Sequence, residues 1–187
     1  MLLSILYIYN QVGTTDYEIL LTFVFSHFEQ KILWFTFFLA FAAKVPMVPV
    51  HLWLPEAHVE APTAGSVILA GVLLKLGTYG FIRFSLPLFP QASFYFTPFV
   101  YTMSLIGIVY TSLTAIRQTD FKRIIAYTSI AHMNVVMLGI FSFNNIGIEG
   151  ALFRRLRQQI RLRRQFCSIG NSAPLAALSE NLDPLAN

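Results

Sequence analysis

Long apolar runs alternate with short polar segments along this chain. Four runs are long enough to cross a bilayer as a helix, which takes about 20 residues: Ile32 to Leu54, Pro62 to Phe84, Phe94 to Ile116 and Ile124 to Phe143. The run from Met1 to Tyr9 is too short, and we interpret it either as the end of a span that begins earlier or as an interfacial anchor. The pattern predicts an all-α, multi-span membrane protein with about four transmembrane helices.

The polar segments predict where these helices are connected. Residues 10–31 are expected to form a loop that contains a short amphipathic helix over residues 17–28, and residues 55–61 are expected to form a hinge. Further connections are predicted at residues 85–93, 117–123 and 144–150. The composition agrees, since 56% of the 187 residues are hydrophobic and 12% are charged, whereas a soluble domain has about 25% charged residues.

Two prolines fall inside the first predicted span. Pro46 and Pro49 each remove a backbone donor and clash with the preceding turn, so they predict a broken helix. Because unpaired carbonyls are costly in hydrocarbon, the break is expected to face protein or water, as in the discontinuous helices of transporters. A plain kinked packing helix is the alternative interpretation of the same two residues.

Three ionisable residues lie inside the apolar spans and are the candidate functional groups. Lys44 and Lys75 sit deep in consecutive spans, and His132 lies part-way along the last one. Ionisable groups at this depth are costly and usually line a protein interior or a water-filled path. Lysines that extend to the headgroups, and a histidine that only bonds a neighbour, remain the alternatives. We interpret the three as a proton pathway.

Other candidate chemistry is weak. His51 and His58 flank the hinge and are expected at the interface, and the tryptophans Trp34 and Trp53 are expected as interface anchors. No phosphate loop, nucleophile triad or redox motif is present. The lone Cys167 excludes an internal disulfide and offers no zinc or iron–sulfur spacing, so no metal, no bound cofactor and no catalytic residue are predicted.

Six arginines crowd the segment after Gly150 and account for the formal net charge of +4. With this segment included, the positive-inside rule gives the opposite orientation to that given without it. We therefore divide the chain into a membrane segment, residues 1–150, and a basic tail, residues 151–187, which we expect to be disordered and unrelated to the rest. The arginines alone would suit nucleic acid, but the membrane-like body argues against that partner.

Three segments carry a resemblance to a known family. They read K-x-P-x-x-P-x-H-x-W-L-P-x-A-H-x-x-A-P from Lys44, L-A-G-x-L-L-K-x-x-x-Y-G from Leu69, and RQTDFKRIIAYTSIAHMN from Arg117. This pattern resembles the chain 4 subunits of proton-pumping NADH–ubiquinone oxidoreductase, respiratory complex I, in their mitochondrial form. It is more distantly similar to subunits of sodium/proton antiporters. The resemblance covers residues 13–150.

The resemblance implies a truncated antiporter-like fold in the mitochondrial inner membrane, with other complex I membrane subunits and the lipid bilayer as partners. It implies that Lys44 lies in a broken helix and pairs with a glutamate of an earlier helix, that Lys75 relays protons, and that His132 continues the path. NAD and ubiquinone would be used by the whole complex and not bound by this chain. The expected departures are the missing glutamate helix, the missing later helices and the arginine tail. An antiporter component and a purely structural membrane fragment remain the alternatives.

Overall fold

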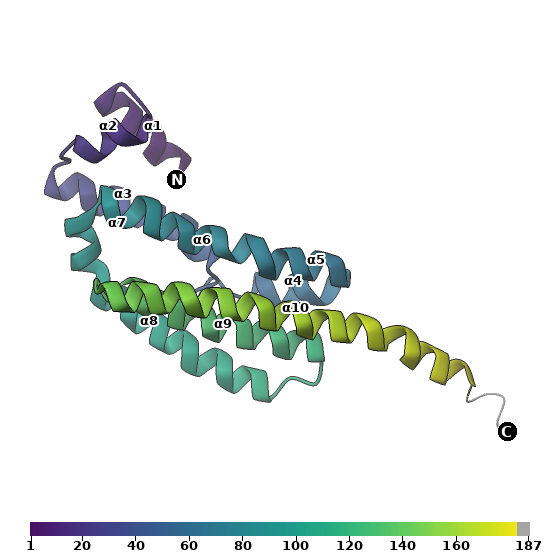
Figure 1. The fold of residues 1–187 in the computed structure, drawn as a ribbon. Coiled ribbons are helices and arrows are strands. Elements are labelled where there is room, and N and C mark those ends of the chain that lie inside the picture. The colour runs from purple at the N-terminus through teal and green to yellow at the C-terminus, as the bar shows by residue number, and fades with distance from the viewer. Residues whose placement is uncertain (183–187) are drawn as a thin grey trace.

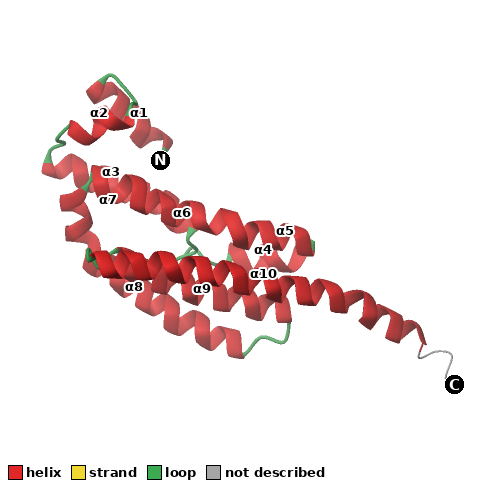
Figure 2. Ribbon diagram, viewed as in Figure 1, coloured by secondary structure: helices red, strands yellow, loops and turns green. Residues whose placement is uncertain are grey.

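The computed structural model describes residues 1–182, and for Thr63 and residues 169–182 it describes the backbone alone. This part of the chain consists of helices joined by short connections, with no strand among the described residues (Figure 2). The prediction of an all-α membrane fold is confirmed. The elements in chain order are α1 (Leu2–Val12), α2 (Tyr17–Thr22), α3 (His27–Lys44), α4 (Trp53–Glu60), α5 (Thr63–Ile68), η1 (Leu69–Leu73), α6 (Leu74–Gly80), η2 (Phe81–Ser85), α7 (Leu86–Leu88), α8 (Pro90–Ile116), α9 (Phe121–Ile140) and α10 (Asn145–Leu182).

Two short helices, α1 and α2, form the N-terminal end of the molecule (Figure 1). Gly13 ends α1 in a left-handed conformation with φ of 79°, which glycine adopts without steric cost. The next helix of the body, α3, starts with a capping box in which the Ser26 hydroxyl accepts from the Glu29 N–H and the Glu29 carboxylate accepts from the Ser26 N–H. This cap starts α3 five residues before the predicted span.

The predicted break in the first span is present. Helix α3 ends at Lys44, and the chain passes through Pro46 and Pro49 without helical structure before α4 begins at Trp53. The Trp53 indole N–H donates to the Ala43 carbonyl over 3.1 Å, so α4 is tied back to the end of α3. The predicted hinge at residues 55–61 is wrong, because α4 covers most of it. Pro55 lies in the first turn of α4, where its missing N–H has no intrahelical partner to lose.

The second predicted span is a helical run of five elements, from α5 through α7. Two π-helical stretches, η1 and η2, interrupt it. A π turn inserts one extra residue and disturbs the regular bonding of the ladder, and such turns are often found at functional sites. The run continues to Leu88, past the predicted end at Phe84, so the predicted loop at residues 85–93 shrinks to the turn around Phe89.

Three helical segments of the described chain are long and apolar enough to cross a membrane: Ala64–Leu88, Pro90–Ile116 and Phe121–Ile140. The remaining predicted span is the broken α3–α4 segment. Helices α8 and α9 lie against each other, and a Cβ at Gly107 of α8 would stand 2.8 Å from the Asn134 amide nitrogen of α9. The third span therefore needs a glycine at this contact.

The prediction of a disordered tail is wrong for residues 151–182, which belong to helix α10. Helix α10 lies along α9 and then extends beyond the body (Figure 1). Its buried side chains recur along one face, namely Ala151, Gln158, Leu162 and Phe166. The arginines between them hide this periodicity in the sequence, and the buried face orders the segment as a helix.

An aromatic cluster fills the core where α3, η2 and α9 meet. Trp34 is fully buried, stacks on Phe38 and Phe96 with ring centroids 5.0 and 4.5 Å apart, and donates from its indole N–H to the Ser93 hydroxyl at 3.0 Å. The prediction that Trp34 anchors an interface is therefore wrong. A long-range hydrogen bond satisfies its polar atom, which lets the whole ring enter the core.

Candidate functional site

Lys75 lies where the π-helical element η1 gives way to α6. Its side chain is 6% exposed, and its ammonium donates to the carbonyl oxygens of Ala70 at 3.1 Å and Gly71 at 3.2 Å. These carbonyls are five and four residues back along the same helix, at the disturbed ladder. An ammonium has three donors, and two are used here. The third is available to a water molecule or another proton acceptor.

Lys44 lies at the end of α3, directly before the break. The structure places its side chain on the surface of the described chain, although the sequence suggested an interior position. The reason is local. Helix α6 packs closely against the backbone of α3 at Gly77. A Cβ added at Gly77 would stand 3.0 Å from the Lys44 Cβ and 3.0 Å from the Phe41 carbonyl oxygen. This contact brings the two lysine-bearing helices together but leaves the Lys44 ammonium outside it.

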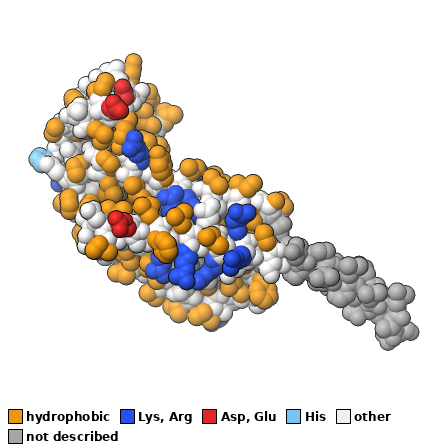
Figure 3. All heavy atoms as spheres, in the orientation of Figure 1, with side chains coloured by type: hydrophobic (Ala, Val, Ile, Leu, Met, Phe, Trp, Pro, Cys, Tyr) orange, Lys and Arg blue, Asp and Glu red, His pale blue; other side chains and the backbone are white. Residues whose placement is uncertain are grey.

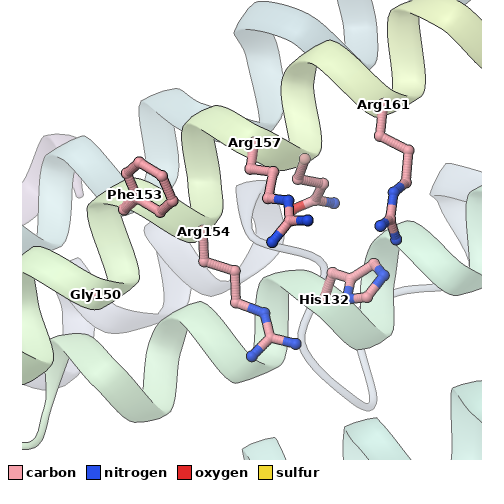
Figure 4. A pocket seen from close by; sticks show the side chains of 7 residues that line it. His132, Gly150, Phe153, Arg154, Arg157 and Arg161 are labelled. Atoms are coloured by element: carbon pink, nitrogen blue, oxygen red, sulfur yellow. The ribbon is translucent and has the colours of Figure 1, made fainter.

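His132 lies on α9, and it is half-buried. It lines a cavity of about 400 Å³ together with Arg154, Arg157 and Arg161 of α10. The three arginine side chains extend from α10 toward α9 and the histidine (Figure 4). The structure therefore groups His132 with arginines and not with the two lysines.

A fourth arginine of α10, Arg155, lies near Lys75. Arg155 is partly buried on the inner side of α10, within electrostatic range of Lys75. A row of basic side chains thus passes from α6 through α10 to α9. In the described part of the chain the one ion pair joins Arg123 and Asp120, so no carboxylate there neutralises this row. The sequence analysis missed Arg155, although its spacing of four residues from Ala151 and three from Gln158 places it on the buried face of α10.

The two histidines near the hinge are buried within the protein. The His58 ring of α4 is fully buried and stacks on Phe166 of α10 with centroids 5.1 Å apart. Lys122, whose ammonium donates to the carbonyls of Val59 and Ala61, lies nearby. His51 is buried against the Tyr110 ring.

Residues 1–172 match the family described as NADH:quinone oxidoreductase/Mrp antiporter, TM. The chain belongs to this family. The match continues past the boundary predicted at Gly150, and it therefore includes the arginine-rich part of α10 that we interpreted as unrelated. Membership also agrees with the helical spans and the broken segment described above.

Curated relatives share much of the sequence. A protein of Marchantia polymorpha named NADH-ubiquinone oxidoreductase chain 4 is 63% identical over 91% of this chain and 34% of its own length. One of Triticum aestivum with the same name is 62% identical over the same shares. NADH-quinone oxidoreductase subunit M of Rickettsia typhi is 52% identical over 90% of this chain and 35% of its own length. The chain spans about a third of the length of these relatives.

Solved structures share the fold. A chain of the respiratory complex I from Thermus thermophilus with bound NADH superposes with a TM-score of 0.84 at 29% identity, over 91% of this chain and 37% of that one. A chain of the Mrp complex from Dietzia sp. DQ12-45-1b gives a TM-score of 0.82 at 22% identity, over 90% of this chain and 32% of that one. The latter likeness shows the fold alone.

Proposed function

We propose that this chain forms part of the membrane arm of a proton-translocating NADH:ubiquinone oxidoreductase in the mitochondrial inner membrane. Other membrane subunits of that complex and the lipid bilayer are its partners. Its contribution is a proton pathway coupled to electron transfer from NADH to ubiquinone, and NAD and ubiquinone are used elsewhere in the complex. The identity of 63% to a chain 4 protein supports this assignment over a sodium/proton antiporter component.

The observation that carries the proposal is the setting of Lys75. A buried ammonium is held on two carbonyls of a π-helical turn, with a third donor free and no carboxylate paired with it in the described chain. Such a group can give up and regain a proton with little side-chain movement, because the carbonyls fix its position in both states. We assign Lys75 the central role, Lys44 and His132 the two flanking steps, and Pro46 and Pro49 the helix break that opens the path.

The test replaces Lys75 with methionine in the native gene. Inner-membrane vesicles are then assayed for NADH:ubiquinone activity and for NADH-driven acidification, and native gels report whether the complex assembles. We expect an assembled complex with proton translocation reduced at least tenfold. The matched control is Lys31→Met, because Lys31 packs over the Tyr95 ring at 4.1 Å, away from the row of basic side chains. The control should pump normally.

Full proton translocation by an assembled Lys75→Met complex would overturn the assigned role. Absence of the chain from the complex on native gels would instead favour the structural-fragment alternative. Transport that requires sodium and continues without NADH would favour the antiporter alternative.

A further inference from the structure

The helix break after Lys44 leaves one backbone carbonyl without its regular donor. In a regular helix the carbonyl of each residue accepts from the N–H of the residue four positions later. Ala42 would therefore bond to Pro46, which has no N–H. The Met47 N–H donates to the Ala42 carbonyl instead, over 3.2 Å. Because Met47 would be the regular donor for Ala43, this shift by one residue takes the donor away from the Ala43 carbonyl.

The indole of Trp53 supplies the missing donor. Its N–H donates to the Ala43 carbonyl over 3.1 Å, across ten residues of chain. Trp53 is the first residue of α4, and Ala43 is the last residue but one of α3. The hydrogen bond therefore joins the start of one half of the broken helix to the end of the other half.

The surroundings of the break make a side-chain donor necessary. Val50 and Leu52, which come just before Trp53, are apolar and are 47% and 57% exposed. Apolar side chains are also spread over the visible face of the body (Figure 3). A membrane protein turns such a surface toward hydrocarbon or toward another apolar helix, where an unpaired carbonyl finds no water to bond. The Trp53 indole therefore satisfies a carbonyl that solvent would not.

The same hydrogen bond restrains the backbone that carries Lys44. The Ala43 carbonyl and the Lys44 N–H belong to one planar peptide unit, so a donor on this carbonyl fixes the orientation of that unit. Gly77 of α6 approaches the Lys44 Cβ so closely that an added Cβ would stand 3.0 Å from it. The Lys44 backbone is thus held by α6 and by Trp53, while its side chain lies on the surface of the described chain.

We propose that Trp53 is a positioning residue, whose indole holds α4 on the end of α3 and so keeps Lys44 in the geometry for proton transfer. We call this hydrogen bond the Trp53 latch. When the latch opens, the two halves of the broken helix lose their fixed orientation, and the Lys44 ammonium is no longer presented in one place. The role rests on the function proposed above, because it acts through Lys44. The latch itself can be measured without proton transport.

The first experiment follows hydrogen exchange of the full chain in lipid nanodiscs by mass spectrometry. Peptides that cover residues 41–54 report on the break, because the N–H groups of Val45 and Met47 are bonded to carbonyls there. Peptides from α8 are the internal reference. Trp53→Phe keeps an aromatic ring and removes the donor. The matched control is Trp34→Phe, which removes the other indole donor of the chain, bonded to Ser93.

We expect Trp53→Phe to speed exchange in residues 41–54 roughly two- to tenfold relative to α8, the factor that corresponds to one net hydrogen bond. Trp34→Phe should leave this ratio unchanged. Replacement of Trp53 by 3-benzothienylalanine, in which sulfur takes the place of the indole N–H, should act as Trp53→Phe does, because it keeps the size of the ring and lacks the donor. Unchanged exchange in either Trp53 variant would overturn the latch, and so would equal acceleration by Trp34→Phe.

The second experiment places Trp53→Phe and Trp34→Phe in the native gene and measures NADH-driven acidification by inner-membrane vesicles, per complex assembled on native gels. We expect Trp53→Phe to translocate protons roughly two- to tenfold more slowly, and Trp34→Phe to translocate normally. A normal rate per assembled complex in Trp53→Phe would overturn the positioning role, because Trp53 would then contribute to stability alone. Full translocation by Lys75→Met would instead overturn the proton pathway, and exchange in residues 41–54 would still decide whether the latch exists.

Discussion

Replacing Gly77 by alanine should separate α6 from the end of α3. A Cβ at this position would stand 2.6 Å from Val45 Cγ2 and 3.0 Å from both the Lys44 Cβ and the Phe41 carbonyl oxygen. Real Cβ atoms essentially never come as close to another atom as 2.6 Å. The Lys44 Cβ and the Phe41 carbonyl oxygen cannot move aside by a change of side-chain rotamer. The helices must therefore move apart.

The expected cost follows from two opposing terms. Forcing a methyl group into a packed contact costs about 1–3 kcal/mol. Alanine in place of glycine inside a helix recovers roughly 0.5–1 kcal/mol. The net loss of unfolding free energy for Gly77→Ala should therefore be about 1–2 kcal/mol.

Gly65→Ala is the matched control, since it makes the same chemical change in the same helical run. Its added Cβ would lie 3.6 Å from Pro62 side-chain atoms, which is ordinary van der Waals contact. We expect this variant to be as stable as the wild type or slightly more stable. The assay is thermal unfolding in lipid bicelles, followed by circular dichroism. Equal stability of the two variants would refute the close packing of α6 on α3.

A further prediction concerns a buried polar group. Trp34→Phe leaves the buried Ser93 hydroxyl without its indole donor, so chemical denaturation should show a loss of about 1–3 kcal/mol. No loss would refute the contribution of this hydrogen bond to stability.

The sequence predicted the spans because their apolar length alone indicates them. It also located the break, since Pro46 and Pro49 cannot continue a helix. It did not predict that Trp34 is buried, because the Ser93 hydroxyl that satisfies its indole lies 59 residues away. The π-helical turn before Lys75 was missed for a similar reason. No residue type marks such a turn, and the ammonium that bonds its carbonyls is visible only in the folded chain.

The arginine-rich segment shows where composition misled the sequence analysis. Six arginines indicated a solvated, disordered tail, and the buried face that carries Ala151, Leu162 and Phe166 was overlooked. A helix is ordered by its packed side, whatever its other side carries. The spacing of those three residues was the available signal, and it would have predicted both the helix and the face on which the arginines gather.

The basic groups of this chain differ in how their charge can be relieved. Lysine and histidine can release a proton, so Lys75 and His132 can become neutral where they stand. Arginine stays charged at any pH that a protein survives. The charges of Arg157 and Arg161 therefore need an anion or water. Proton transfer therefore falls to the groups that can lose their charge, Lys75 and His132, and not to the arginines.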